Sequence, residues 1–483
     1  MKTELCENEP VSRLRPVLVV LLVWAAIYLP ALGSTAIKGE EGRRILPAVR
    51  MLETGNYIVP QMGSYPYYRK PPLVNWLVAA SFKIFGTLNE WTARLPSAFS
   101  VLAVAIAFVT VARPSLGARG SLLAALIWMT NIGMIEKGRL IEIEALYVSL
   151  CGLAIIFWLS FFLQKKSPWL IWVPASVFLG LGLLAKGPTH LVFFYGVVLA
   201  VVAYAKDWRL FFHPAHLIAI AIMLGIAAAW AIPFTHSTTA QVAMDKWSAQ
   251  YTGRLKGVDF KFFSWIQNIP RSLVYFLPWV VLFPFARVSK FPDESQRRFA
   301  RAMGWGIAMP FLAVNLVPGA VPRYSMPAIV PASWLLAMIC AGNALQWSRV
   351  WIKNDWNWTQ VVAAFTGLGL VIGAIGYPLT AVILKNRQQV KKAAAEINAP
   401  VPSTETLYAV NPDYQPVFFY LNAPVKYASY VKNLPANTHY FVVQAQSETE
   451  ATAAQNFAPR RAYPLARIHT RGQREVTLFR VGQ

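Results

Sequence analysis

Charged residues are scarce in this chain, and acidic residues are the scarcer kind. Of 483 residues only 14% are charged, and 22 Asp and Glu stand against 45 Lys and Arg. Long uncharged runs separate the charges, which excludes a large soluble core and indicates a protein that crosses a membrane several times. The net charge of +23 comes without a soluble basic face or a reader motif, so nucleic-acid binding is not expected.

Cysteine is also rare, at three residues. Cys6 precedes the first apolar run, and Cys151 and Cys340 lie inside apolar runs. None of them stands where a disulfide could brace an outer domain, and their spacing does not support a thiolate metal site.

The apolar runs predict an α-helical polytopic membrane protein. A spanning helix needs roughly 20 mostly apolar residues, and about eleven runs reach or approach that length. They are Val17–Leu32, Leu95–Ala112, Gly120–Ile135, Ala145–Leu163, Pro168–Ala185, Thr189–Ala205, Ala215–Phe234, Ser272–Ala286, Ala302–Val317, Tyr324–Leu345 and Val361–Leu384.

Cationic loops predict the orientation of these spans. Arg13 and Arg15 precede the first span, and an odd number of spans places most other basic loops on the same side. The N-terminus is therefore expected in the cytoplasm. The catalytic outer loop 34–94 and a soluble domain at 386–483 are expected outside, beyond a membrane domain of residues 1–385.

The soluble region after the last span indicates a small α/β domain. Strands are predicted at Leu407–Val410, Val417–Leu421, His439–Val443 and Val476–Val481, where apolar residues alternate or cluster. In the outer loop, Glu40–Leu52 predicts a short helix with a glycine stop at Gly55.

Charged motifs in the outer loops mark a candidate site, because charges beside lipid are costly. The first loop carries GEEGRR (Gly39–Arg44) and YYRKPP (Tyr67–Pro72). Cations are least expected on this side, and several of them predict a pocket for an anion such as a lipid phosphate. They are Arg43, Arg44, Arg69, Lys70, Arg139, Lys186, Arg254 and Arg323.

Four outer carboxylates supply the other half of the chemistry. Glu40, Glu41, Glu142 and Glu144 could act as general bases or bind a hard cation. A base, a phosphate clamp and access from the membrane describe the attack of an acceptor on a sugar carried by a polyprenyl phosphate.

Two alternative functions, each of a different class of protein, stay open. A lipid-phosphate transporter or flippase would carry charges at mid-membrane and internal repeats, whereas these charges lie at the outer interface. A non-catalytic polyprenyl-phosphate-binding protein would tolerate loss of the Glu40 carboxylate.

The motifs together resemble a known family. GEEGRR, MLETGNYIVP, YPYYRKPPL and ARLPSA, followed by GRLIEIEAL, LLAKGP and RYSMPAIVP, are similar to the dolichyl-phosphate-mannose protein mannosyltransferase-like superfamily. Within this superfamily, the motifs most resemble those of the bacterial aminoarabinose transferases that modify lipid A. The resemblance implies a GT-C type fold and a sugar donor of the undecaprenyl-phosphate type, with a lipid, a glycan or a protein as the acceptor. It also implies a location in the bacterial inner (plasma) membrane, with a periplasmic active site.

The resemblance also implies roles for single residues. Glu40 is the expected base, Glu41 is its acidic neighbour, and Arg43 is similar to the phosphate-contacting Arg of the same motif. Lys70, with Tyr67 beside it, matches the lysine that binds donor phosphate. Glu144 matches the acidic residue of the second loop, with Glu142 as a close competitor. Further expected substrate contacts are Arg139, Lys186, Arg254, Arg323 and Tyr324.

Two departures from the family pattern concern a metal ion. Glu40 stands where the family usually has Asp, and Arg69 replaces a carboxylate that often precedes the lysine. Metal dependence is therefore open, with Glu40 and Glu144 as the ligands of any divalent ion.

Overall fold

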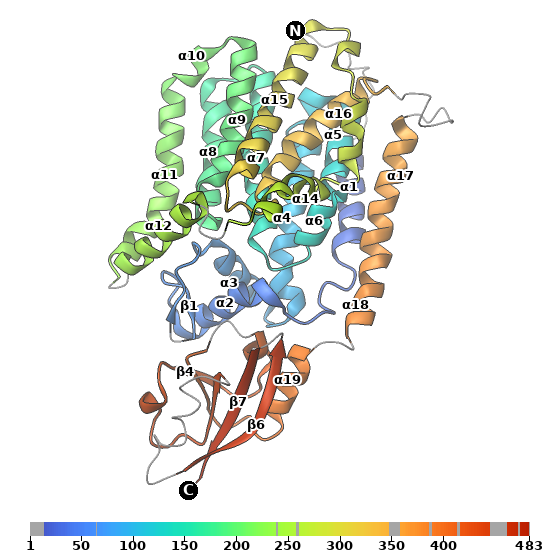
Figure 1. The fold of residues 1–483 in the computed structure, drawn as a ribbon. Coiled ribbons are helices and arrows are strands. Elements are labelled where there is room, and N and C mark those ends of the chain that lie inside the picture. Colours follow the sequence, from blue (N-terminus) through green and yellow to red (C-terminus); the bar gives the residue numbers. More distant parts are fainter. Residues whose placement is uncertain are drawn as a thin grey trace. The chain divides into compact units, whose positions relative to one another are not determined.

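The computed structural model describes residues 14–63, 65–237, 240–256, 260–346, 358–385, 389–412, 416–444, 461–471 and 474–482. The chain divides into two compact units (Figure 1). The helical unit consists of Met1–Pro30, Arg69–Leu73 and Leu95–Pro378, and the sheet unit of Ala31–Tyr68, Val74–Arg94 and Leu379–Gln483. Most of the first outer loop thus groups with the C-terminal residues, whereas its segment Arg69–Leu73 groups with the helical unit. The predicted domain boundary at 385 stays a prediction.

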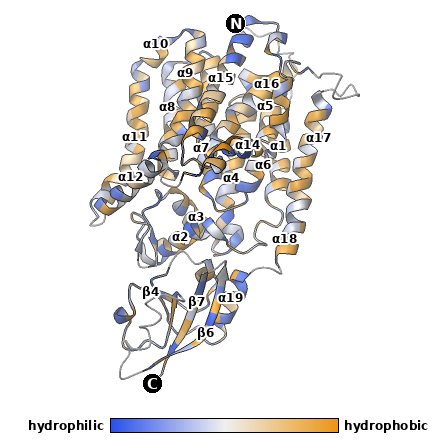
Figure 2. Ribbon diagram, viewed as in Figure 1, coloured by the Kyte–Doolittle hydropathy of each residue, from blue (hydrophilic) through white to orange (hydrophobic). Residues whose placement is uncertain are grey.

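The helical unit is built from helices in which most residues are apolar (Figure 2). Its α-helices in chain order are α1 (Leu14–Tyr28), α4 (Glu90–Thr110), α5 (Arg113–Thr130), α6 (Ile132–Lys137), α7 (Ile143–Leu163), α8 (Pro168–Ala185), α9 (Thr189–Ala205), α10 (Trp208–Phe211), α11 (Pro214–Thr235), α12 (Ala240–Lys256), α13 (Phe262–Ile266), α14 (Asn268–Val274), α15 (Glu294–Leu316), α16 (Ile329–Ala341), α17 (Trp358–Val371) and α18 (Tyr377–Lys385). Shorter helical turns are η2 (Trp279–Phe285), η3 (Val288–Lys290), η4 (Pro322–Ala328) and the π-helical η5 (Ile372–Gly376).

Seven helices within the described residues are long and apolar enough to cross a membrane. Three further apolar helices, α1, α9 and α3 (Leu73–Phe85), are shorter. This arrangement confirms the predicted polytopic helical fold with a small C-terminal sheet. Helix α7 is buried along most of its length and packs against α8, α9 and α16, so it forms the centre of the unit.

Two of the predicted spans are not single helices. The run Ser272–Ala286 is divided between α14 and η2, because Pro278 and Pro284 each lack the backbone N–H that a continuous helix needs. The run Gly120–Ile135 is interrupted at Asn131, whose extended backbone separates α5 from α6. Apolar composition alone does not reveal such breaks.

The sheet unit combines the first outer loop with a five-stranded sheet. The loop holds η1 (Gly39–Glu41), α2 (Gly42–Thr54), the hairpin β1 (Gln61–Met62) and β2 (Tyr65–Pro66), and α3. The C-terminal part holds α19 (Gln389–Asn398), β3 (Leu407–Val410), η6 (Pro416–Tyr420), β4 (Val425–Ala428), η7 (Val431–Asn433), β5 (Tyr440–Gln444), β6 (Ala462–Arg471) and β7 (Arg474–Val481).

The sheet has the strand order β4-β3-β5-β7-β6. Strand β3 is parallel to β4 and to β5, and β7 is antiparallel to β5 and β6. Strands β3, β5 and β7 confirm three of the predicted strands. The fourth prediction, Val417–Leu421, is wrong, because this apolar run forms the 3-10 helix η6, which buries Val417 and Phe418.

Local rules explain how α2 is bounded. The helix ends at Thr54, where Gly55 adopts a left-handed backbone (φ 70°) and its N–H bonds to the Met51 carbonyl. At its start, the η1 turn carries Glu40 and Glu41 directly into the helix. The predicted short helix is therefore confirmed, although Pro47 lies inside it.

Candidate functional site

Glu40 lies in the η1 turn of the sheet unit, next to two arginines. Its Oε1 is 2.6 Å from Arg43 Nη1, and its Oε2 is 3.8 Å from Arg44 Nη2. The side chain is 37% exposed, so the carboxylate stays open to a substrate while the arginines orient it. The spacing of three and four residues produces this arrangement, because such residues share one helical face.

Arg44 links Glu40 to Tyr67. Its Nη1 donates to the Tyr67 hydroxyl at 2.7 Å, and its backbone carbonyl accepts from Asn75 Nδ2 at 2.8 Å. Both Arg44 and Tyr67 are buried. Tyr67, predicted from the YYRKPP motif, is therefore linked to the predicted base through a hydrogen bond to Arg44 and the ion pair of Arg44 with Glu40.

Glu41 is placed very differently from its neighbour. The guanidinium of Arg94 binds both of its oxygens, at 2.8 Å and 3.0 Å, and both side chains are buried. Arg94 also donates to the backbone carbonyls of Leu32, Thr35 and Ala36. The pair fixes the chain that leads into η1, and a substrate contact by Glu41 stays a prediction.

Arg94 is a residue that the sequence reasoning missed. Its only signal was its place in the ARLPSA motif, which was quoted as a pattern and given no role. A buried guanidinium with this number of partners holds a backbone conformation more than it binds a ligand.

Glu144 is the centre of a charge cluster in the helical unit. It lies in the first turn of α7, and its side chain is 8% exposed. Its Oε1 is 3.3 Å from Lys186 Nζ and 3.1 Å from Arg323 Nε. The three residues come from α7, the end of α8 and η4, so the fold brings together charges that lie far apart in the sequence.

Aromatic rings cover the same cluster. The Lys186 ammonium lies 4.6 Å from the ring centroid of Tyr324 and 5.1 Å from that of Tyr147. A cation over an aromatic face is stabilised by the ring quadrupole. The predicted residues Glu144, Lys186, Arg323 and Tyr324 therefore converge in one place.

A second cluster of charged side chains comes from residues that shortly precede Glu144 in the sequence. Lys137 Nζ lies 2.8 Å from Glu136 Oε1 and 2.9 Å from Glu142 Oε2. Burial opposes the charge on Lys137, but the carboxylates of Glu142 and Glu136 outweigh it and raise the pKa of the ammonium. Glu142 is thus engaged by Lys137, whereas Glu144 is engaged by the predicted substrate cations.

The remaining predicted residues have other surroundings. Arg139 is fully buried, donates to the backbone carbonyls of Ile27 and Pro30, and lies 3.8 Å from the ring centroid of Tyr377. These partners hold α1 in the helical unit, and substrate binding by Arg139 stays a prediction. Arg69 is exposed and Lys70 half-buried in the segment Arg69–Leu73. The side chain of Arg254, on α12, lies outside what the structure describes.

Among the described residues no group of three or more His, Cys, Asp and Glu side chains converges. Glu40 and Glu144 each face two cations instead. We therefore route no chemical step through a metal ion.

Comparisons with known proteins agree with this picture. A family model described as dolichyl-phosphate-mannose-protein mannosyltransferase matches residues 69–232. Relatives named undecaprenyl phosphate-alpha-4-amino-4-deoxy-L-arabinose arabinosyl transferase 2 are found in Pseudomonas fluorescens and Proteus mirabilis. Each is 24% identical, over 66% and 76% of this chain respectively. These matches span 58% and 66% of the relatives' own length.

The fold is also that of a solved structure. The crystal structure of ArnT from Cupriavidus metallidurans bound to undecaprenyl phosphate is 18% identical, with a TM-score of 0.72 over 96% of this chain and 97% of that one. The fold is therefore that of a polytopic helical membrane protein, and it is shared with this ArnT structure. Residues 69–232 are thus similar to the dolichyl-phosphate-mannose-protein mannosyltransferase family, and relatives of the chain are named as aminoarabinose transferases.

Proposed function

We propose that this protein is an integral-membrane inverting glycosyltransferase. It moves a sugar from a polyprenyl-phosphate donor to a hydroxyl or phosphate of an acceptor on the periplasmic face of the bacterial inner membrane. The acceptor is lipid A, another envelope glycan or a protein. The observation that carries the proposal is the cluster in which Lys186 and Arg323 converge on Glu144, in a unit made mostly of apolar helices.

Each step has a residue type suited to it. Glu40 removes the proton from an acceptor hydroxyl, and the resulting oxygen attacks the anomeric carbon. The bond from that carbon to the donor phosphate breaks, and polyprenyl phosphate leaves with the electron pair. Cations at Lys70, Lys186 and Arg323 stabilise the charge that grows on the leaving phosphate. A single displacement from the opposite face inverts the anomeric configuration.

The nature of the acceptor changes what Glu40 must do. A hydroxyl has to lose its proton during attack, whereas a phosphate acceptor is already an anion at neutral pH. Glu40→Gln should therefore abolish transfer to a hydroxyl and slow transfer to a phosphate much less, because only the first reaction needs a base.

The test uses the purified protein in lipid, with extracted membranes as donor and acceptor. Release of free polyprenyl phosphate is measured for the wild type, for Glu40→Gln and for Glu53→Gln. Glu53 is a matched control, because it is an exposed carboxylate paired with Arg50 in α2. Release by the wild type and by Glu53→Gln supports glycosyl transfer, and the labelled product names the acceptor. Binding of the donor without any release contradicts it and favours a binding or transport protein.

Localisation and metal dependence are tested separately. A reporter fused after residue 384 should read as periplasmic, and a cytoplasmic signal would overturn the proposed orientation. We infer that transfer continues in the presence of a chelator, because cations of the chain take the place of a bound ion. Loss of transfer on chelation, with recovery on adding back Mg²⁺ or Mn²⁺, would show the opposite.

A further inference from the structure

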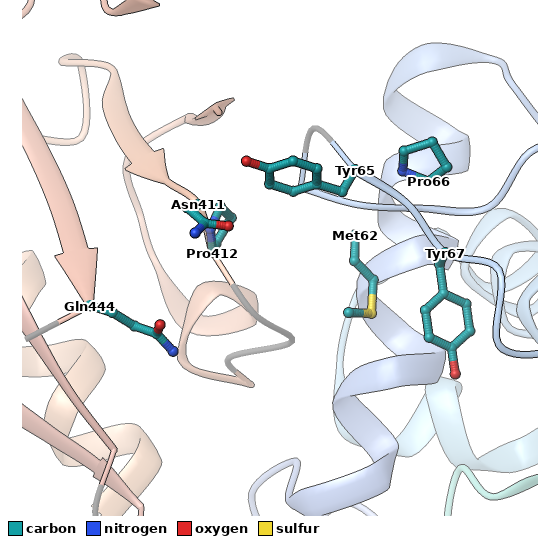
Figure 3. Close-up of a pocket in the computed structure, with 7 residues that line it drawn as sticks. All are labelled: Met62, Tyr65, Pro66, Tyr67, Asn411, Pro412 and Gln444. Carbon is teal, nitrogen blue, oxygen red and sulfur yellow. The ribbon is translucent and has the colours of Figure 1, made fainter. Parts of the chain in front are cut away.

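A cavity of about 340 Å³ lies within the sheet unit. One wall comes from the first outer loop, with Met62, Tyr65 and Tyr67. The other comes from the C-terminal sheet, with Asn411, Pro412 and Gln444. Figure 3 shows these two groups facing each other across the cavity. Its volume is in the range of small-molecule sites.

The topology of the sheet places this cavity where ligands usually bind. Asn411 directly follows β3 and Gln444 ends β5, and these strands are parallel neighbours. The chain leaves β3 toward β4 on one side of the sheet, and it leaves β5 toward β6 and β7 on the other. In open sheets ligands bind beyond the carboxyl ends of parallel strands, at the point where the connections diverge.

Contacts hold the two walls at a fixed distance. The Tyr65 hydroxyl donates to the Ser429 carbonyl at 3.2 Å. Gly63 has a left-handed backbone (φ 65°), and a Cβ there would lie 2.8 Å from Pro412 and 2.9 Å from the ring of Tyr427. Only glycine allows this approach, so the cavity is a built feature of the sheet unit.

The lining chemistry fits an uncharged sugar. The described lining residues are uncharged, and several carry amide or hydroxyl groups, which favours a neutral ligand rich in hydroxyl groups. The carboxamides of Asn411 and Gln444 can both donate to and accept from hydroxyl groups. The partly exposed ring of Tyr65 offers an apolar face with a polar tip, which suits the C–H face of a pyranose.

One residue of the cavity wall is linked through Arg44 to the predicted base, Glu40. Tyr67 is among the lining residues, and its hydroxyl accepts from Arg44, whose guanidinium lies 3.8 Å from the Glu40 carboxylate. A ligand in the cavity therefore lies next to a residue that is linked through Arg44 to the η1 turn.

We propose that the cavity binds a neutral sugar unit of the acceptor, so that the C-terminal sheet acts as a subsite for acceptor recognition. This proposal rests on the proposed glycosyl transfer. It assigns a carbohydrate-bearing acceptor to the protein and a binding role to Asn411 and Gln444.

The experiment compares Asn411→Ala and Gln444→Ala with Gln389→Ala in the full-length protein. Gln389 is a matched control, because it is an exposed carboxamide on α19, away from the cavity lining. Saturation-transfer NMR with methyl glycosides of neutral hexoses should show binding to the wild type and to Gln389→Ala. The signal should be lost in the two cavity variants. In the transfer assay the acceptor KM should rise about fivefold to tenfold in these variants, in line with a lost hydrogen bond, while the donor KM stays unchanged.

Other outcomes separate the two proposals. Equal NMR signals in all four proteins, or an acceptor KM that does not move, would overturn the sugar subsite and leave glycosyl transfer standing. Variant effects that occur only with a peptide acceptor would also overturn it. Absence of polyprenyl phosphate release from the wild type would overturn the transferase itself, whatever the NMR result.

Discussion

At the scale of single residues, adjacent glutamates have opposite environments. Glu40 is half open and faces two arginines, whereas Glu41 is buried against Arg94. An exposed ion pair contributes little to stability, and breaking a buried one costs much more, because it leaves an unpaired charge. The first carboxylate is thus available for chemistry, and the second maintains the loop that presents it.

Replacing Arg94 should therefore destabilise the protein far more than replacing Glu40. Arg94→Met leaves the Glu41 carboxylate buried without its partner and should lower the free energy of unfolding by about 3–5 kcal/mol. Glu40→Gln should change it by about 1 kcal/mol or less. Thermal unfolding in detergent measures both. Equal losses would contradict the division of roles between the two glutamates.

At the level of secondary-structure elements, the η1 turn that carries Glu40 is braced by residues that follow the apolar helices. The Tyr420 hydroxyl, at the end of η6, donates to Glu90 Oε1 at 3.0 Å and accepts from the Ile37 N–H at 2.6 Å. Lys391 Nζ, from α19, lies 2.6 Å from the same Glu90 oxygen. All four residues belong to the sheet unit, and the chain runs from Ile37 directly into η1.

Removing this hydroxyl should affect both stability and activity. Tyr420→Phe leaves the Ile37 N–H and the Glu90 carboxylate short of a partner, at a cost of about 1–3 kcal/mol. Because the turn that carries Glu40 follows Ile37, kcat should fall more than the donor KM changes. Tyr430→Phe serves as the control, since Tyr430 is exposed. A Tyr420→Phe enzyme with wild-type kcat would exclude this bracing role.

Alkaline pH should weaken the sheet unit through Tyr427. Burial in β4 raises the pKa of its phenol to about 12, whereas an unfolded tyrosine ionises near 10. The free energy of unfolding should therefore fall as the pH rises from about 10 toward 12, because only the unfolded state releases the proton. Thermal midpoints between pH 8 and 12 test this. Tyr427→Phe should show a smaller fall than the wild type, and parallel curves would contradict the assignment.

At the scale of the whole molecule, the first outer loop and the C-terminal sheet share one compact unit. The hairpin of β1 and β2, helix α3 and the start of α4 all contact residues beyond 400, through Tyr65, Phe82 and Glu90 respectively. The loop that carries Glu40 therefore depends on residues more than 300 positions away.

Truncation tests this dependence directly. A chain that ends after residue 384 keeps the apolar helices but loses the partners of the first outer loop. We expect it to insert in the membrane, to lose transfer activity, and to become sensitive to protease between residues 34 and 68. A truncated protein whose loop stays protected from protease would contradict the shared unit.

The membrane class, most of the helices and the residues of the first motif could be predicted from the amino-acid sequence. Spanning helices can be recognised from the length and composition of apolar segments. The pairing of Glu40 with Arg43 follows from their spacing of three residues on a helix. Three strands of the C-terminal sheet were also predictable, because alternation is a local signal.

Only the tertiary structure decided which distant charges meet. Several contacts join positions that are far apart in the sequence. Lys186 and Arg323 both pair with Glu144, Arg94 pairs with Glu41, and the Tyr420 hydroxyl donates to Glu90. Charge–charge contacts depend on distances of a few ångströms in space, which packing sets and local composition does not. For the same reason the cavity between the first outer loop and the C-terminal sheet could not be read from either segment alone.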